Sequence, residues 1–223
     1  MNTIPKFPRL FLALLCVLTL GVSPAAAQRP RRKTPPAVPV GTAQPAALAA
    51  RSVVDKFAPA GWTRYEIGTP MRFSLILPGK PSESTERMQL TPGIAATVRN
   101  YMSLGASGLY GATYIDGLPA GVMNEELKRT FFESFVKGFA EEFQSQMSKT
   151  GTSAEVTMLE QRVASAADLA GYEQDFEFDR MTGRIRLVYH GSRAYAVMSL
   201  WSETMDDRER TTFFNSLRVN RKR

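Results

Sequence analysis

The chain of 223 residues contains one cysteine, Cys16, and one histidine, His190. Cys16 lies in an N-terminal segment that we expect to be removed, so the mature protein would have no cysteine. Disulfide bonds, thiol catalysis and cysteine-ligated zinc are then excluded, and the fold must be stabilised by the burial of apolar side chains alone. Any catalytic machinery of the Ser-His-Asp type would have to use His190.

Residues 1–27 predict a cleavable secretory signal peptide. Lys6 and Arg9 come first, and the apolar run over residues 10–20 is shorter than the roughly 20 apolar residues that a transmembrane helix needs. Three alanines end the segment and predict cleavage after Ala27. We therefore expect a periplasmic or secreted protein with no transmembrane span in its mature form.

Two alternatives to cleavage are open at this point. The segment could stay in place as an uncleaved anchor, or Cys16 could be the lipidated residue of a lipoprotein. Leu15 disfavours the lipoprotein, because a lipoprotein signal has a small residue immediately before its cysteine.

The formal net charge of +7 does not indicate a nucleic-acid-binding domain. Seven of the 28 basic residues lie before residue 52, where the chain has no acidic residue, so the rest of the chain has no formal net charge. A nucleic-acid-binding groove needs basic residues clustered on the folded domain. We therefore expect no nucleic-acid partner.

Residues 28–57 predict a basic linker rich in proline and alanine, which begins with the motif Arg29-Pro30-Arg31-Arg32-Lys33. Most of the segment has too few large apolar side chains to offset the entropy of ordering, so we expect an extended spacer. The alternative is a weak contact with an anionic surface, to which each basic residue would contribute about 1 kcal/mol.

Residues 58–219 predict a single folded domain, and residues 220–223 form a basic tail. The first half of the domain predicts an antiparallel meander, because short apolar runs alternate with turn residues. We expect strands over residues 63–67, 71–77, 87–90, 96–104 and 109–115.

A long amphipathic helix is predicted next, with Asn124 as its N-cap and Lys149 in its last turn. Large apolar residues recur every fourth position from Leu127 to Met147. This stripe could bind a membrane, but its flanks are not enriched in cations, so we expect it to pack against the sheet. A short helix over residues 206–217 would end the domain.

Between the two helices, acidic side chains alternate with aromatic ones, and a second run alternates arginines with aliphatic residues. If residues 180–183 form the loop, Asp179 faces Arg184 and Glu177 faces Arg186. Such a ladder of ion pairs explains the acidic row better than a calcium site, because a flat strand does not wrap around a cation. The row comprises Glu173, Asp175, Glu177 and Asp179.

His190 precedes a hairpin turn, Gly191-Ser192, which would place it opposite Arg193. The register chosen above would also place Glu173 across from His190. No serine lies in a Gly-x-Ser-x-Gly motif, so nothing else supports a hydrolase. We expect no enzyme, and we assign no catalytic, cofactor-binding or metal-binding residue.

The order of the predicted elements resembles the PsbP-like family, which includes photosystem-associated lumenal proteins, a small Ran-binding protein and exported bacterial proteins. The resemblance covers roughly residues 60–219. It is carried by this layout and by two short motifs: Phe73-Ser74-Leu75-Ile76-Leu77-Pro78 with Pro81 after it, and Phe213-Phe214-Asn215-Ser216-Leu217. It implies an α+β fold, an antiparallel sheet flanked by helices on both sides, and a non-enzymatic scaffold or assembly role. No functional residue of the family is matched by motif.

The leading hypothesis is an exported, non-catalytic domain that binds a protein or an envelope component. The alternative is a domain that binds a small apolar ligand or lipid between the phenylalanine-rich helix and the aromatic sheet. A hydrolase that uses His190 is the third hypothesis. No cofactor is expected.

Overall fold

The computed structural model describes residues 50–68, 71–91, 94–119, 123–149, 155–202 and 206–220. The predicted signal peptide and the linker up to residue 49 lie outside these residues. Strands make up 55% of the described residues and helices 22%, so antiparallel sheet dominates the fold.

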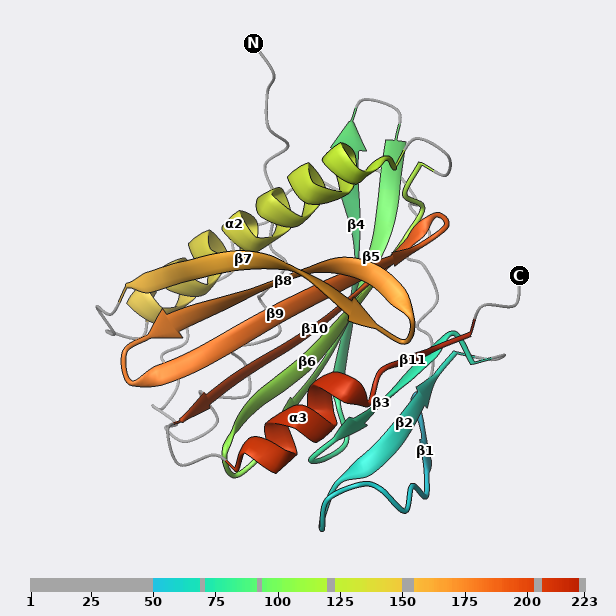
Figure 1. Cartoon of the computed structure of the whole chain (residues 1–223), viewed down its shortest axis with the longest axis vertical. Coiled ribbons are helices and arrows are strands. Elements are labelled where there is room, and N and C mark those ends of the chain that lie inside the picture. Colours follow the sequence, from blue (N-terminus) through green and yellow to red (C-terminus); the bar gives the residue numbers. More distant parts are fainter. Residues whose placement is uncertain are drawn as a thin grey trace, which may run out of the picture.

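The larger sheet has seven antiparallel strands in the order β4-β5-β6-β10-β9-β8-β7 (Figure 1). All neighbours in this sheet follow one another in the sequence except β6 and β10, so the three strands before the long helix meet the four strands after it at that pair. The strands are β4 (Ser82–Thr91), β5 (Ile94–Leu104), β6 (Gly108–Asp116), β7 (Val156–Ala166), β8 (Leu169–Phe178), β9 (Met181–His190) and β10 (Arg193–Ser202).

The smaller sheet has four antiparallel strands in the order β1-β2-β3-β11. Its two central strands are sequence neighbours, whereas β11 reaches β3 from the end of the chain. Ala50, the first described residue, pairs with Ile67 in this sheet and lies within the residues predicted as linker. The strands are β1 (Ala50–Val53), β2 (Thr63–Ile67), β3 (Phe73–Leu77) and β11 (Arg218–Val219).

The long helix α2 (Glu125–Lys149) begins and ends as predicted, and the Leu127 amide donates to Asn124 Oδ1 at 2.8 Å. Its apolar stripe packs against one face of the seven-stranded sheet, where Phe139 and Phe143 contact Phe176 and Phe178. The stripe is therefore part of a core, as expected. Among the described helices, none is both long enough and apolar enough to cross a membrane.

The opposite face of the seven-stranded sheet is covered by the short helix α3 (Asp207–Asn215) together with the smaller sheet (Figure 1). Asp206 is the N-cap of α3 and accepts a hydrogen bond from the Arg208 amide. A second core lies here, and it is rich in aromatic residues. Its members include Phe73, Tyr101, Tyr110, Tyr114, Tyr195, Trp201, Phe213 and Phe214.

The predicted fold class, an α+β sandwich of one sheet with helices on both sides, is wrong. The structure is mostly antiparallel sheet and contains two sheets. The run Phe73–Leu77, predicted as part of one meander, belongs to the second sheet and is buried along its whole length. Its partner β11 is distant in sequence and only two residues long, so no local pattern indicates this pairing.

The predicted register of the β8–β9 hairpin is also wrong. The turn has two residues, with Phe178 paired to Met181 and Asp179 in the left-handed region at φ 54°. Arg184 therefore pairs with Asp175, and Arg186 pairs with Glu173. The acidic partner of each arginine lies four positions before the predicted one. Because four is an even number, the predicted faces of both strands are still correct.

Candidate functional site

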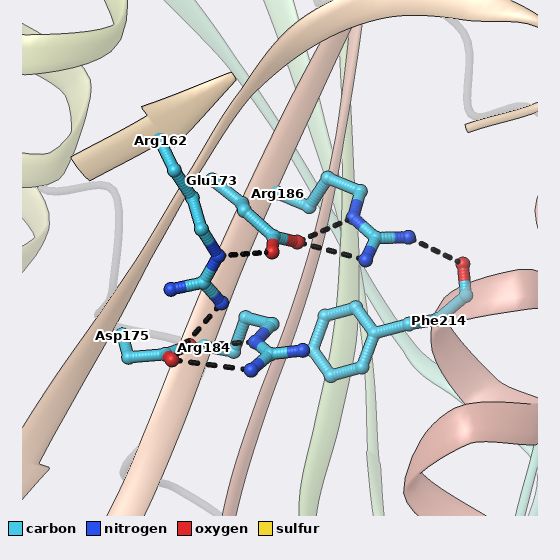
Figure 2. Close-up of polar contacts among 6 residues, drawn as sticks. All are labelled: Arg162, Glu173, Asp175, Arg184, Arg186 and Phe214. Atoms are coloured by element: carbon cyan, nitrogen blue, oxygen red, sulfur yellow. Dashed lines mark hydrogen bonds and ion pairs between the residues drawn. The ribbon is translucent and has the colours of Figure 1, made fainter. Parts of the chain in front are cut away.

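The most extensive polar arrangement in the described part of the chain is a group of five charged side chains on β7, β8 and β9, here called the ion-pair cluster (Figure 2). Arg162 Nε donates to Glu173 Oε1 at 2.6 Å, and Arg162 Nη2 donates to Asp175 Oδ2 at 3.0 Å. From the other side, Arg184 Nε donates to Asp175 Oδ1 at 2.6 Å and Arg186 Nε to Glu173 Oε2 at 2.7 Å. Each carboxylate thus lies between two guanidinium groups.

The two carboxylates of the cluster are held in their charged form. Burial alone would raise the pKa of Glu173, but hydrogen bonds from Arg186 and Arg162 outweigh it, so its pKa lies below 4.5. Asp175 follows the same pattern, with Arg184 as its main partner, and its pKa lies below 3.8. A calcium ion would have to displace these arginines, so the cluster is suited to ion pairing and not to cation binding.

The cluster also joins the sheet to α3. The guanidinium groups of Arg184 and Arg186 lie 5.6 and 5.4 Å from the ring centroid of Phe214, and Arg186 Nη1 donates to the Phe214 carbonyl at 3.4 Å (Figure 2). The predicted ladder of ion pairs is thus present, with different partners from those expected. Its contacts are internal, which indicates a structural role.

The structure does not bring together the residues of the hydrolase hypothesis. His190 pairs with Arg193, as predicted. Glu173, which the predicted register placed across from His190, instead pairs with Arg186 and is fully engaged in the ion-pair cluster. Ser107, in the Gly-rich turn, contacts Tyr110 and Glu209, so it has no histidine among these partners.

A second polar arrangement anchors the loop between β1 and β2, residues 54–62, here called the β1–β2 loop. The Asp55 carboxylate accepts hydrogen bonds from Arg64 Nε and from the Phe57 amide, and both Asp55 and Arg64 side chains are only 6% exposed. The hydrogen bond from Arg64 holds the pKa of Asp55 below its usual value. Arg64 Nη1 donates in addition to Ser74 Oγ at 3.1 Å and to the Ser216 carbonyl at 2.8 Å.

The anchored loop presents two large apolar side chains to solvent. Val54 is fully exposed and Phe57 is 69% exposed. The Lys56 ammonium lies 5.0 Å from the centroid of the Phe57 ring. Exposed apolar side chains on a loop that is fixed by a buried ion pair point to a contact surface.

Two neighbouring cavities separate the β1–β2 loop from the outer face of α3. One has a volume of about 350 Å³ and the other about 430 Å³, and Phe57, Arg208 and Thr212 line both. The first also contains Lys56 and Glu209, and the second contains Arg64, Arg218 and Asn215 among its lining residues.

Sequence reasoning missed this region because it treated residues 28–57 as linker. One signal could have found it. Asp55 is the first acidic residue of the chain, and it lies among the apolar residues Val53, Val54 and Phe57, after a long stretch of small residues and prolines. Such a change of composition is typical of the entry into a folded domain.

Comparisons with known proteins include a structural likeness. No protein-family model matches the chain, and no curated protein is significantly similar to it. The solution structure of cyanobacterial PsbP from Synechocystis sp. PCC 6803 is similar, with 9% sequence identity and a TM-score of 0.43 over 75% of this chain and 98% of that one. The likeness agrees in part with the resemblance noted from the sequence. At this level it concerns the fold at most, and it says nothing about the role of this chain.

Proposed function

We propose that this chain is an exported, non-catalytic domain that binds a protein of the cell envelope through the β1–β2 loop. The observation that carries the proposal is the exposure of Val54 and Phe57 on a loop whose base is fixed by the buried Asp55–Arg64 pair. Because the loop is already ordered, little conformational entropy would be lost when a partner covers its apolar side chains.

The surroundings of the loop indicate the charge of the partner. Phe57 lines both cavities together with four basic residues, Lys56, Arg64, Arg208 and Arg218, and with two acidic ones, Asp206 and Glu209. An apolar centre with a charged rim is the usual arrangement of a protein–protein contact, and the excess of basic residues favours a partner with acidic side chains. Five basic residues of the predicted linker precede this loop in the sequence and would add positive charge: Arg29, Arg31, Arg32, Lys33 and Arg51.

The alternative, a small apolar ligand between α2 and the sheet, has less support. Phe132, Phe135, Phe139 and Phe143 are packed into the core, and none of them lines a cavity described here. The hydrolase hypothesis has lost the Glu173 partner of His190. A binding domain is therefore the function that the geometry supports best.

The proposal can be tested by capture of partners from envelope extracts with the purified full chain. We expect a specific partner to be retained by the wild-type protein and lost by the double variant Val54→Ser/Phe57→Ser. The matched control is Leu104→Ser/Val163→Ser, which also removes two exposed apolar side chains, away from the loop. Equal capture by the two double variants, or no specific partner for the wild type, would contradict the proposal. A variant without residues 28–49 separates the contribution of the linker from that of the loop.

A further inference from the structure

The larger of the two cavities beside the β1–β2 loop is lined by basic side chains. Arg64, Arg208 and Arg218 line it, and no carboxylate is among its described lining residues. The Asp55 carboxylate pairs with Arg64 and offsets one of the three positive charges. Arg218 Nη2 lies 3.7 Å from the same carboxylate, which is a long contact for an ion pair. Positive charge therefore remains in the cavity.

Arg64 is built into the wall of this cavity. Only 5% of the residue is exposed, and two of its three guanidinium nitrogens bond to Asp55, Ser74 and Ser216. These bonds use Nε and Nη1 and hold the side chain rigidly in the cavity wall. Nη2 takes part in none of these three bonds, so it can donate to a group that enters the cavity.

The outer face of α3 supplies further donors. Arg208, Thr212 and Asn215 recur at intervals of four and three residues, so they lie on one face of the helix, and all three line the cavity. Arg208 forms no ion pair within the described part of the chain, and its amide is the group that Asp206 caps. Hydroxyl, amide and guanidinium groups thus converge on one space.

We propose that this cavity, between the β1–β2 loop, β3 and α3, binds a phosphate-type oxyanion held by Arg64, Arg208 and Arg218. Guanidinium groups present paired N–H donors that match the oxygen atoms of phosphate, and the Thr212 hydroxyl and the Asn215 amide can donate as well. A volume of about 430 Å³ leaves room for an organic group attached to the phosphate, and Phe57 would form the apolar wall beside it. The oxyanion belongs either to a soluble phosphate ester or to a lipid headgroup.

The inference goes beyond the proposed function and does not depend on it, because phosphate binding is measured with the purified chain alone. The two proposals share Phe57, but Val54 lines neither cavity. Val54→Ser should weaken partner capture while phosphate binding is retained, so the failure of one proposal can be told from the failure of the other.

The test is calorimetric titration of the full chain with inorganic phosphate and with glycerol phosphate, alongside co-sedimentation with phosphatidylcholine vesicles that contain or lack phosphatidic acid. The variant is Arg208→Ala/Arg218→Ala, in which both changed side chains are on the surface. The control is Arg129→Ala/Lys137→Ala on α2, which removes the same charge from exposed sites in another part of the protein.

We expect the Arg208→Ala/Arg218→Ala variant to bind phosphate about tenfold more weakly or worse, and the control to bind like the wild type. Binding of the soluble ions identifies a soluble ester as the ligand class, and binding of phosphatidic acid vesicles alone identifies a lipid headgroup. The proposal is overturned if neither probe binds, or if the two double variants lose affinity equally, since charge alone would then explain the binding.

Discussion

The aromatic ring of Phe176 lies over Gly183, its partner across the β8–β9 pair. A Cβ atom added at Gly183 would overlap the carbon atoms of this ring, so the ring occupies the space of the missing side chain. Phe176 is fully buried and contacts Phe139 of α2, with 5.1 Å between the ring centroids. The glycine therefore permits the closest packing between the sheet and the long helix at this point.

Replacing Gly183 should destabilise the protein through this contact. We expect Gly183→Ala to lower the free energy of unfolding by about 2 kcal/mol, because Phe176 must move within a packed core. Gly79→Ala is the matched control, since a Cβ there would meet only Ser103 Oγ at an ordinary 3.5 Å. Denaturant unfolding of both variants measures the difference. A Gly183→Ala protein as stable as the control would show that the ring does not depend on the glycine.

The contact between Phe176 and Gly183 explains why the register of β8 against β9 could not be predicted from the sequence. Alternation of acidic and apolar residues fixes which side chains share a face, but it is satisfied equally by any shift of an even number of residues. The prediction placed residues 180–183 in the loop, although Gly183 lies in the strand β9. The tight turn at Asp179 and Arg180 and the fit of Phe176 over Gly183 select the observed register.

Local patterns predicted the elements better than their assembly. The bounds of α2 follow from its N-cap, Asn124, and from its four-residue repeat, both of which are visible in the sequence. The division into two sheets depends on β11 reaching β3 and on β1 adding to β2, which are pairings without a periodic signal. The anchored β1–β2 loop was missed for the same reason, since Arg64 and Ser216 meet only in the folded chain.

Loss of one charge in the ion-pair cluster should have a large effect. Glu173 is buried and accepts hydrogen bonds from Arg162 and Arg186. We expect Glu173→Gln to lower the free energy of unfolding by about 2 kcal/mol. This is less than the full cost of breaking a buried ion pair, because solvent screens part of the interaction. The control is Glu177→Gln, an exposed residue on the same face of β8, for which we expect a change of about 0.5 kcal/mol or less. Thermal unfolding at neutral pH compares the two, and equal effects would mean that the cluster contributes no net stability.

The anchor of the β1–β2 loop can be tested in the same way. Asp55→Asn leaves the Arg64 guanidinium buried without its counter-ion, so we expect a loss of about 3 kcal/mol. The loop should also become susceptible to limited proteolysis near Phe57, because the Phe57 amide loses its hydrogen bond to a charged carboxylate. Lys56→Gln changes the charge of the neighbouring exposed residue and should alter neither property. If the two variants unfold at the same temperature, the buried pair does not anchor the loop.

Among the described acidic residues, Glu86 on β4 has an environment that favours its neutral form. Its side chain faces α2, where burial, and then the proximity of Glu142, raise the pKa of Glu86 from 4.5 to about 7. Asn100 Nδ2 lies 3.4 Å from Glu86 Oε1, at the long end of a hydrogen bond. The folded protein therefore holds a proton that the unfolded chain releases.

This proton makes stability depend on pH with a definite sign. Between pH 4.5 and about 7 the folded state binds more protons than the unfolded state at this group, so the contribution of Glu86 to stability falls as the pH rises. After allowance for solvent screening, we expect a loss of about 1 kcal/mol over this range. Three acids with lowered pKa values act in the opposite sense: Asp55, Glu173 and Asp175. Their charged forms stabilise the folded protein at neutral pH, and this contribution is lost as the pH falls below about 4.

Glu86→Gln should remove the dependence and leave a protein about 1 kcal/mol more stable than the wild type above pH 7, because a neutral side chain then faces Glu142 at every pH. Glu83→Gln, at an exposed position on the same strand, should keep the dependence of the wild type. The measurement is the free energy of unfolding at several pH values from 4.5 to 8 for the three proteins. If Glu86→Gln and the wild type lose stability in parallel as the pH rises, the proton is held by another group and not by the contact between β4 and α2.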